Sequence, residues 1–232
     1  MGMEMIETLP LLSHGDYAAL AVLILAWAGI TWLIERRSAS KPSVTVLMER
    51  YRHDWMRAMA ARENRGFDAT ILSNLRQGTA FFASGSLIAL GGVLAIAGRA
   101  DQLQVLAAQL NVLSQGGAVW QLKLVVAALL LTHGFLKFVW SNRLFGYCSV
   151  MMAAMPEGAE DPAARTRARQ AAEINCRAAA HLNRGLRSVY YALTVLAWLM
   201  GWAALIAAVL AATWVLWHRE FASSSRAVLL ER

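Results

Sequence analysis

Charged side chains are scarce in this chain of 232 residues: Asp, Glu, Lys and Arg make up 16% of it, against about 25% in a typical soluble domain. Hydrophobic residues make up 58%, above the usual range of roughly 45–50%. This composition excludes an ordinary water-soluble enzyme and a disordered chain. Cysteine is scarce as well, because Cys148 and Cys176 are the only two. A disulfide scaffold is therefore excluded, and no Cys/His spacing indicates a metal site.

The apolar residues are concentrated in four runs. Each run is long enough to cross a bilayer core about 30 Å thick, which requires roughly 20 helical residues. The predicted spans are residues 17–34, 77–98, 119–140 and 188–217. The third contains Lys123 and Lys137 near its ends, from which long side chains reach the headgroups. The fourth exceeds the hydrocarbon thickness, so we expect it to tilt or to begin outside the bilayer.

Basic residues are unevenly distributed between the segments that flank these spans. Segments 35–77 and 141–188 hold sixteen Lys and Arg residues, whereas segments 1–16, 99–118 and 218–232 hold four. Because short segments rich in Lys and Arg stay in the cytoplasm, we expect both termini on the periplasmic side of a bacterial inner membrane. The net charge of +7 is then a signal of topology, and no nucleic-acid partner is predicted.

The predicted cytoplasmic segments, 43–66 and 141–187, both have helical periodicity. Apolar residues of the first recur at three- and four-residue spacing, namely Met48, Tyr51, Trp55 and Met59. We expect this stripe to pack on the bundle or to lie among the inner headgroups, with a protein partner as the alternative. In the second segment the third span continues as a helix until Pro156, and Asp161-Pro162 is typical of the start of a new helix.

Small residues form stripes on two of the predicted spans. The second span carries Gly78, Gly85 and Gly92 at seven-residue steps, and the fourth carries Ala197, Gly201, Ala204 and Ala208 at steps of three or four. Helices in lipid associate through close backbone approach, so we expect these two spans to contact each other or to form an oligomer seam. The predicted fold is an all-α integral membrane four-helix bundle with amphipathic cytoplasmic helices, a single membrane domain over residues 1–232.

No residue pattern indicates catalysis: P-loop, GxSxG and HExxH motifs are absent from the sequence. We therefore predict neither an enzyme nor a cofactor. His133 lies deep in a span, where metal or haem ligation is the functional interpretation and a hydrogen-bonded packing role is favoured.

Two polar clusters lie next to the predicted inner membrane surface. Their members are Arg62, Asn64, Arg65, Asp68, His181, Asn183 and Arg187. We expect these side chains to meet in a buried network that docks the loop helices on the bundle. The alternative is a site for an anionic lipid headgroup or a small anion.

Several stretches of the chain also carry a family likeness. They are Trp55-Met56-Arg57, Arg62-Glu63-Asn64-Arg65 with Asp68, Phe81-Phe82-Ala83-Ser84, Phe138–Phe145, and His181–Tyr191 with Trp198. Together they resemble an uncharacterised membrane-protein family, domain of unknown function 599, from about Lys41 to Leu210. The resemblance implies a multi-pass membrane protein of bacteria and plants and implies no activity.

These features predict a non-enzymatic accessory or scaffold protein that binds membrane lipids or partner subunits. It would be a homo-oligomer or part of a larger membrane complex. The alternative is a small oligomeric channel or transporter with a basic polar site on the cytoplasmic side. A continuous lined cavity favours transport, whereas a filled bundle with an exposed small-residue face favours the scaffold.

Overall fold

The computed structural model describes residues 12–38, 40–99, 117–156 and 161–231, which are almost entirely helical and contain no strand. The elements are α1 (His14–Glu35), α2 (Val44–Ala60), α3 (Gly66–Ala97), α5 (Gly117–Ala153), α6 (Pro162–Leu196), the short 3-10 helix η1 (Ala197–Met200), α7 (Trp202–Phe221) and α8 (Ser224–Leu230). Four segments are long and apolar enough to cross a membrane: α1, α3, α5 and the stretch formed by α7 and α8. The predicted all-α membrane bundle is confirmed.

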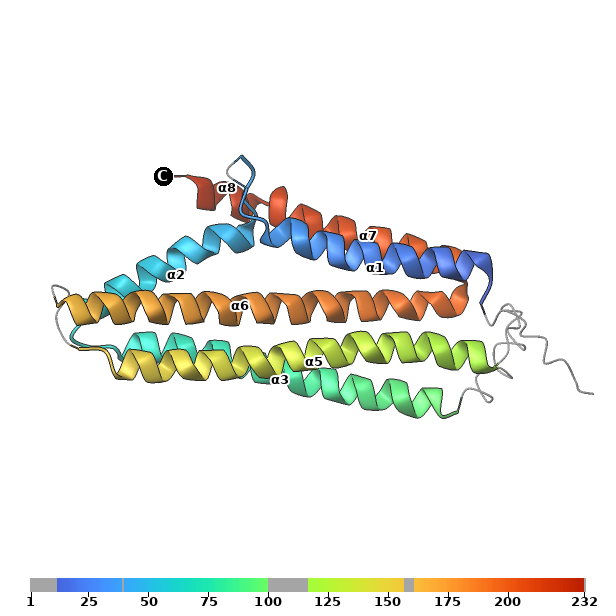
Figure 1. Ribbon diagram of the computed structural model, residues 1–232, viewed down its shortest axis with the longest axis horizontal. Helices are drawn as coiled ribbons and strands as arrows, with labels where there is room; N and C mark the ends of the chain where they lie inside the picture. Colours follow the sequence, from blue (N-terminus) through green and yellow to red (C-terminus); the bar gives the residue numbers. More distant parts are fainter. Residues whose placement is uncertain (1–11, 39, 100–116, 157–160, 232) are drawn as a thin grey trace, which may run out of the picture.

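The helices form three layers with α6 in the middle (Figure 1). On one side α5 runs antiparallel to α6, and α3 packs on α5; on the other side α1 and α7 lie together, and α2 crosses the first half of α6. Two hydrogen bonds locate α6 and the following η1 along α5. Ser141 Oγ donates to the Ala178 carbonyl at 2.7 Å, and Lys123 Nζ donates to the Trp198 carbonyl at 3.1 Å. The second half of α6 is therefore a fifth traverse beside the four apolar segments.

The predicted fourth span, 188–217, is wrong because the chain reverses within it. Helix α6 ends at Leu196, η1 follows, and α7 starts at Trp202. Between them Gly201 has φ 124° and ψ 165°, a conformation that is essentially restricted to glycine. Gly201 is thus a turn residue and not part of a packing stripe. The run exceeded one membrane thickness because it supplies parts of two helices.

The described chain ends are arranged differently from the expected placement of both termini on one side of the membrane. Helices α1 and α7 run parallel, since Gly15 lies against Trp202 at one end. Near the opposite end, Thr45 donates its backbone N–H and its hydroxyl to Glu220, each at 3.0 Å. We call the first end the Gly201 end and the other the α2 end. The first described residues of the chain lie at the Gly201 end and the last lie at the α2 end (Figure 1).

The predicted start and stop signals of the loop helices are confirmed. Asp161 caps α6 by accepting from the Ala163 N–H at 2.8 Å, with Pro162 in the first turn. Helix α5 ends at Ala153, shortly before Pro156. Residues 157–160 of the predicted turn, and segments 1–11 and 100–116 of the charge count, lie outside the described residues.

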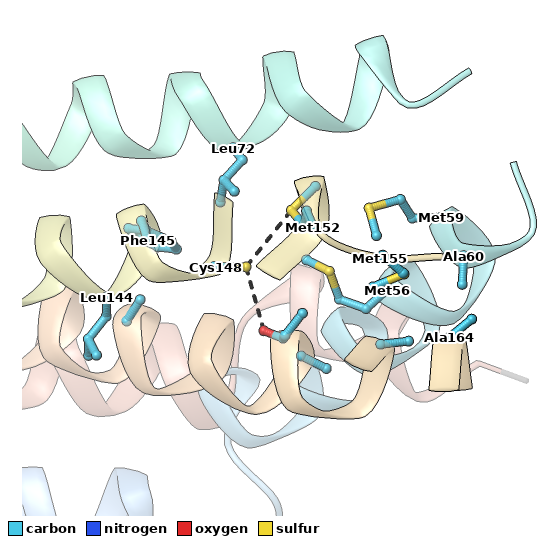
Figure 2. Packing of buried hydrophobic residues seen from close by; sticks show 14 residues of the cluster. Met56, Met59, Ala60, Leu72, Leu144, Phe145, Cys148, Met152, Met155 and Ala164 are labelled. Atoms are coloured by element: carbon cyan, nitrogen blue, oxygen red, sulfur yellow. Dashed lines mark hydrogen bonds between the residues drawn. The ribbon is translucent and has the colours of Figure 1, made fainter. Parts of the chain in front are cut away.

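A sulfur-rich core joins α2, α3, α5 and α6 at the α2 end (Figure 2). Its buried sulfur-bearing residues are Met56, Met59, Cys148, Met152 and Met155. Met59 and the half-buried Trp55 of the predicted stripe pack here, whereas Tyr51 is exposed. Packing of α2 on the bundle is therefore confirmed. Both cysteines are free.

Candidate functional site

The polar residues predicted to form one network form two separate groups. Four of them, Arg62, Asn64, Arg65 and Asp68, lie where α2 leads into α3. Arg62 Nη1 and Trp55 Nε1 both donate to Asp68 Oδ1, at 2.5 and 2.7 Å. Asp68 is fully buried, and its other oxygen, Oδ2, has no hydrogen-bond partner among the described residues. This group joins the start of α3 to α2.

The other two residues near this turn bind backbone groups. Arg65 donates to the carbonyls of Met155 and Pro156, at 2.7 and 2.9 Å. These bonds hold the segment that follows α5 against the start of α3. Asn64 accepts from the Gly66 N–H at 2.9 Å. Neither side chain contacts the second group. The prediction of a single network is wrong, because the first half of α6 lies between the two groups.

The second group surrounds Glu35, the last residue of α1. Arg184 binds Glu35 through two nitrogens, Nε at 2.9 Å and Nη2 at 2.5 Å. Arg187, whose side chain is 2% exposed, donates to the same carboxylate and, through Nε, to Thr31 Oγ1 at 3.2 Å. One carboxylate therefore faces two guanidinium groups at the level where α1 ends. This pattern ties α1 to the middle of α6.

His181 and Asn183 contribute little to this group. His181 packs edge-on against Trp140, with ring centroids 6.4 Å apart, and its Nδ1 atom is buried without a hydrogen-bond partner in the described part of the chain. Asn183 makes a long 3.5 Å contact with Thr45. His133 is hydrogen-bonded to Ser188 at 2.7 Å and packs against the edge of Trp27, as the packing interpretation expects.

A further buried ionic group lies at the Gly201 end. Asp16 accepts from Trp198 Nε1 at 2.6 Å and lies 3.8 Å from Lys123 Nζ. Lys123 is 1% exposed, so the expectation that it reaches the headgroups is wrong. Asp16 and Glu35 lie 19 residues apart on α1, or about 28 Å at 1.5 Å per residue. The two ionic groups are therefore separated by nearly the thickness of a bilayer core.

The small-residue stripes do not bring α3 and α7 together. Among the described helices, α3 packs extensively only on α5. A Cβ atom added at Gly78, Gly85 or Gly92 would meet nothing within 4 Å. These glycines face outward from the bundle, so the prediction that the two stripes contact each other is wrong. The alternative, that the stripes form a seam between copies of the protein, stays a prediction. The close helix approach occurs elsewhere: a Cβ on Gly185 of α6 would come within 2.6 Å of Phe138 on α5.

A cavity of about 380 Å³ lies between α2, α6 and the α7–α8 segment. Its lining mixes both charges, with Arg52 and Glu49 from α2 and Glu220 from α7. Arg52 is held by Asn175, and its burial lowers the pKa of the guanidinium. Burial raises the pKa of the Cys176 thiol in this cavity to about 11. The thiol is therefore protonated at neutral pH and is a poor nucleophile.

Sequence reasoning missed the carboxylates of both membrane-level groups. Asp16 and Glu35 are the charged residues on either side of the first predicted span, 17–34. The distance between Asp16 and Glu35 along one helix is about the thickness of a bilayer core, and this spacing could have identified them. Their partners lie far along the chain, so the sequence offered no local pattern for them.

One protein family matches most of the chain. The family described as "Protein of unknown function, DUF599" matches residues 18–225. The chain belongs to this family. No curated protein and no solved structure matches the chain. The matched range includes most of α1, the described helices from α2 to α7, and both groups of polar residues around Asp68 and Glu35.

Proposed function

We propose that this protein is a non-enzymatic membrane scaffold that assembles with further copies of itself through the outward face of α3. The observation that carries the proposal is the isolation of α3. Only 6% of its most apolar stretch is buried inside the bundle, against 39% for α5. A 32-residue apolar helix with one extensive neighbour leaves most of its surface for lipid or for another protein.

The open glycines make that surface suitable for a second helix. Gly78, Gly85 and Gly92 repeat every seven residues, so they lie on one side of α3. Glycine allows two backbones to approach closely, and van der Waals contact and lipid release then stabilise the pair. Large exposed side chains flank the stripe, including Phe81 and Ile88. They would pack around the contact.

The polar groups of the bundle favour a scaffold over a channel. Glu35 is bonded to Arg184 and Arg187, and Asp16 is bonded to Trp198 and Lys123. A channel uses such groups to line a water-filled path. Here they bind one another and hold α1 against α5 and α6.

Cross-linking tests assembly through α3. We expect Gly85→Cys to form a disulfide-linked dimer on oxidation in native membranes, because Gly85 faces away from the bundle. The matched control is Ser86→Cys, since Ser86 is buried in the bundle. We expect no dimer from the control or from the unsubstituted protein. Absence of the dimer for Gly85→Cys, or equal yields at the two positions, would contradict the proposal.

We also propose an orientation in a bacterial inner membrane, with the Gly201 end periplasmic and the α2 end cytoplasmic. The basic residues support it, because Arg219 and Arg226 of the tail lie at the α2 end with the two basic-rich loops. Arg226 donates to the Pro42 carbonyl at 2.9 Å, and Arg219 lies over the Tyr190 ring. The difference in Lys and Arg content between the two ends of the bundle is thus larger than the count from the sequence, which assigned Arg219 and Arg226 to the other side.

Cysteine labelling tests this orientation. We expect a membrane-impermeant maleimide to label Arg99→Cys in intact spheroplasts, because Arg99 lies at the Gly201 end beyond α3. Ser224→Cys, at the exposed start of α8, should react only after the membrane is permeabilised. The unsubstituted protein controls for Cys148 and Cys176. Labelling of Ser224→Cys from outside would reverse the orientation.

A further inference from the structure

A pocket of about 350 Å³ lies between α1, α5 and α6. Along α1 it extends from Glu35 back to Trp27, about two helical turns toward the Gly201 end. Its lining residues come from one face of α1, from two positions one turn apart on α5, and from Arg184 of α6. Because α1 and α5 are membrane-spanning candidates, the pocket opens among apolar helices and not into the cavity below α2. We call it the Lys137 pocket.

The Lys137 pocket has more positive than negative groups. Glu35 is its only acidic lining residue, and that carboxylate is already bonded by Arg184 and Arg187. Lys137 is half-buried and forms no hydrogen bond or ion pair within the described ranges of the chain. An ammonium group at this depth is costly without a counter-ion. The structure therefore leaves Lys137 short of an anionic partner.

The groups around Lys137 also suit an anionic ligand. Trp27 and Trp32 line the pocket, and Trp32 is 63% exposed, as expected of an aromatic side chain at headgroup level. Arg36 lies over the Trp32 ring at 5.2 Å and adds a cation close to the lining. His133 is fixed through Nδ1 to Ser188. Cations, indole rings and a half-open site between helices are the features that hold phosphate-bearing lipid headgroups.

We propose that the Lys137 pocket binds the phosphate of an anionic phospholipid headgroup from the leaflet at the α2 end. Lys137 and the free edge of the Arg184 guanidinium bind the phosphoryl oxygens, and the two tryptophans contact the glycerol region. Occupancy supplies the anion that Lys137 lacks. The site is separate from α3, so it does not depend on assembly through that helix.

Native mass spectrometry of the purified protein with equal amounts of phosphatidylglycerol and phosphatidylcholine tests the proposal. We expect the protein to retain phosphatidylglycerol preferentially. Lys137→Gln should weaken this retention about fivefold, which corresponds to the ~1 kcal/mol that one basic side chain contributes near an anionic surface. Lys137→Arg should keep most of it, because the charge is preserved.

Lys41→Gln is the matched control. Lys41 lies over the Trp217 ring at 5.1 Å, also near the α2 end but outside the Lys137 pocket. It should retain phosphatidylglycerol as the unsubstituted protein does. Equal retention by Lys137→Gln and Lys41→Gln, or no preference between the two lipids, would overturn the proposal.

Two further measurements complete the test. Inorganic phosphate added to the lipid-loaded protein should leave phosphatidylglycerol bound; its displacement would show that the pocket takes a phosphoryl group from water and would overturn the lipid assignment. The melting temperature of Lys137→Gln without added lipid should match that of the unsubstituted protein, since Lys137 bonds no described residue. A lowered value would assign Lys137 a structural role instead.

Discussion

Asp16→Ala is expected to lower the free energy of unfolding by about 3–5 kcal/mol, the usual cost of removing one partner from a buried ion pair. Asp16 is fully buried and has three roles. It completes the cap of α1 with Ser13, accepts from the Trp198 indole, and faces the ammonium of Lys123. The substitution leaves a lysine that is 1% exposed without its carboxylate. Chemical denaturation in detergent measures the loss.

Asp161→Ala is the matched control for the loss of a cap. Asp161 also caps a helix, as the N-cap residue of α6, but at a more exposed position and without an ion pair to any described residue. Its replacement should cost only about 1 kcal/mol. The double variant Asp16→Ala with Lys123→Met should recover part of the loss, because both buried charges are then absent. Equal losses for the two aspartates would show that the pair with Lys123 contributes nothing.

Arg187→Ala is expected to cost about 3 kcal/mol, the lower end of the same range, because Arg184 still faces Glu35. Arg187 is the most buried arginine described, and it joins α6 to α1 through Glu35 and Thr31. Removing it leaves a cavity beside a carboxylate. The free energy of unfolding and its coupling to Glu35→Ala, from a double-mutant cycle, measure the effect.

Arg167→Ala provides the comparison on the same helix. Arg167 is an exposed residue of α6, and among the described residues its side chain donates to the Ala154 carbonyl. Its replacement should change stability by less than about 0.5 kcal/mol, as is usual at the surface. A loss at Arg187 no larger than that at Arg167, or zero coupling with Glu35, would mean that this group does not stabilise the bundle.

The helical class and most helix ends were predictable because they depend on local signals. Apolar runs of membrane length gave α1, α3 and α5. Asp161-Pro162 gave the start of α6, since a cap and a first-turn proline act within a few residues. The amphipathic stripe gave α2 and part of its buried face, although Tyr51 turned out to be exposed.

The candidate site was predictable in composition and not in arrangement. Arg187 and Asp68 were correctly selected as polar residues that the fold buries. Their partners were assigned wrongly, because a sequence does not show that α6 is long enough to keep the two groups apart. Lys123 was expected to reach the headgroups, since the carboxylate that holds it lies on a distant helix.

By itself, the sequence determined that this chain is a helical membrane bundle, because mean apolarity, periodicity and capping are properties of neighbouring residues. Only the tertiary structure decided how the chain crosses the bundle. A single glycine, Gly201, divides a run that the sequence presents as one span, and the described chain ends therefore lie at opposite ends of the bundle. Distant carboxylates hold the buried charges of the bundle: Glu35 binds Arg184 and Arg187 of α6, and Asp16 binds Trp198 of η1 and Lys123 of α5. Such pairs form between helices, so they exist only once the helices have packed.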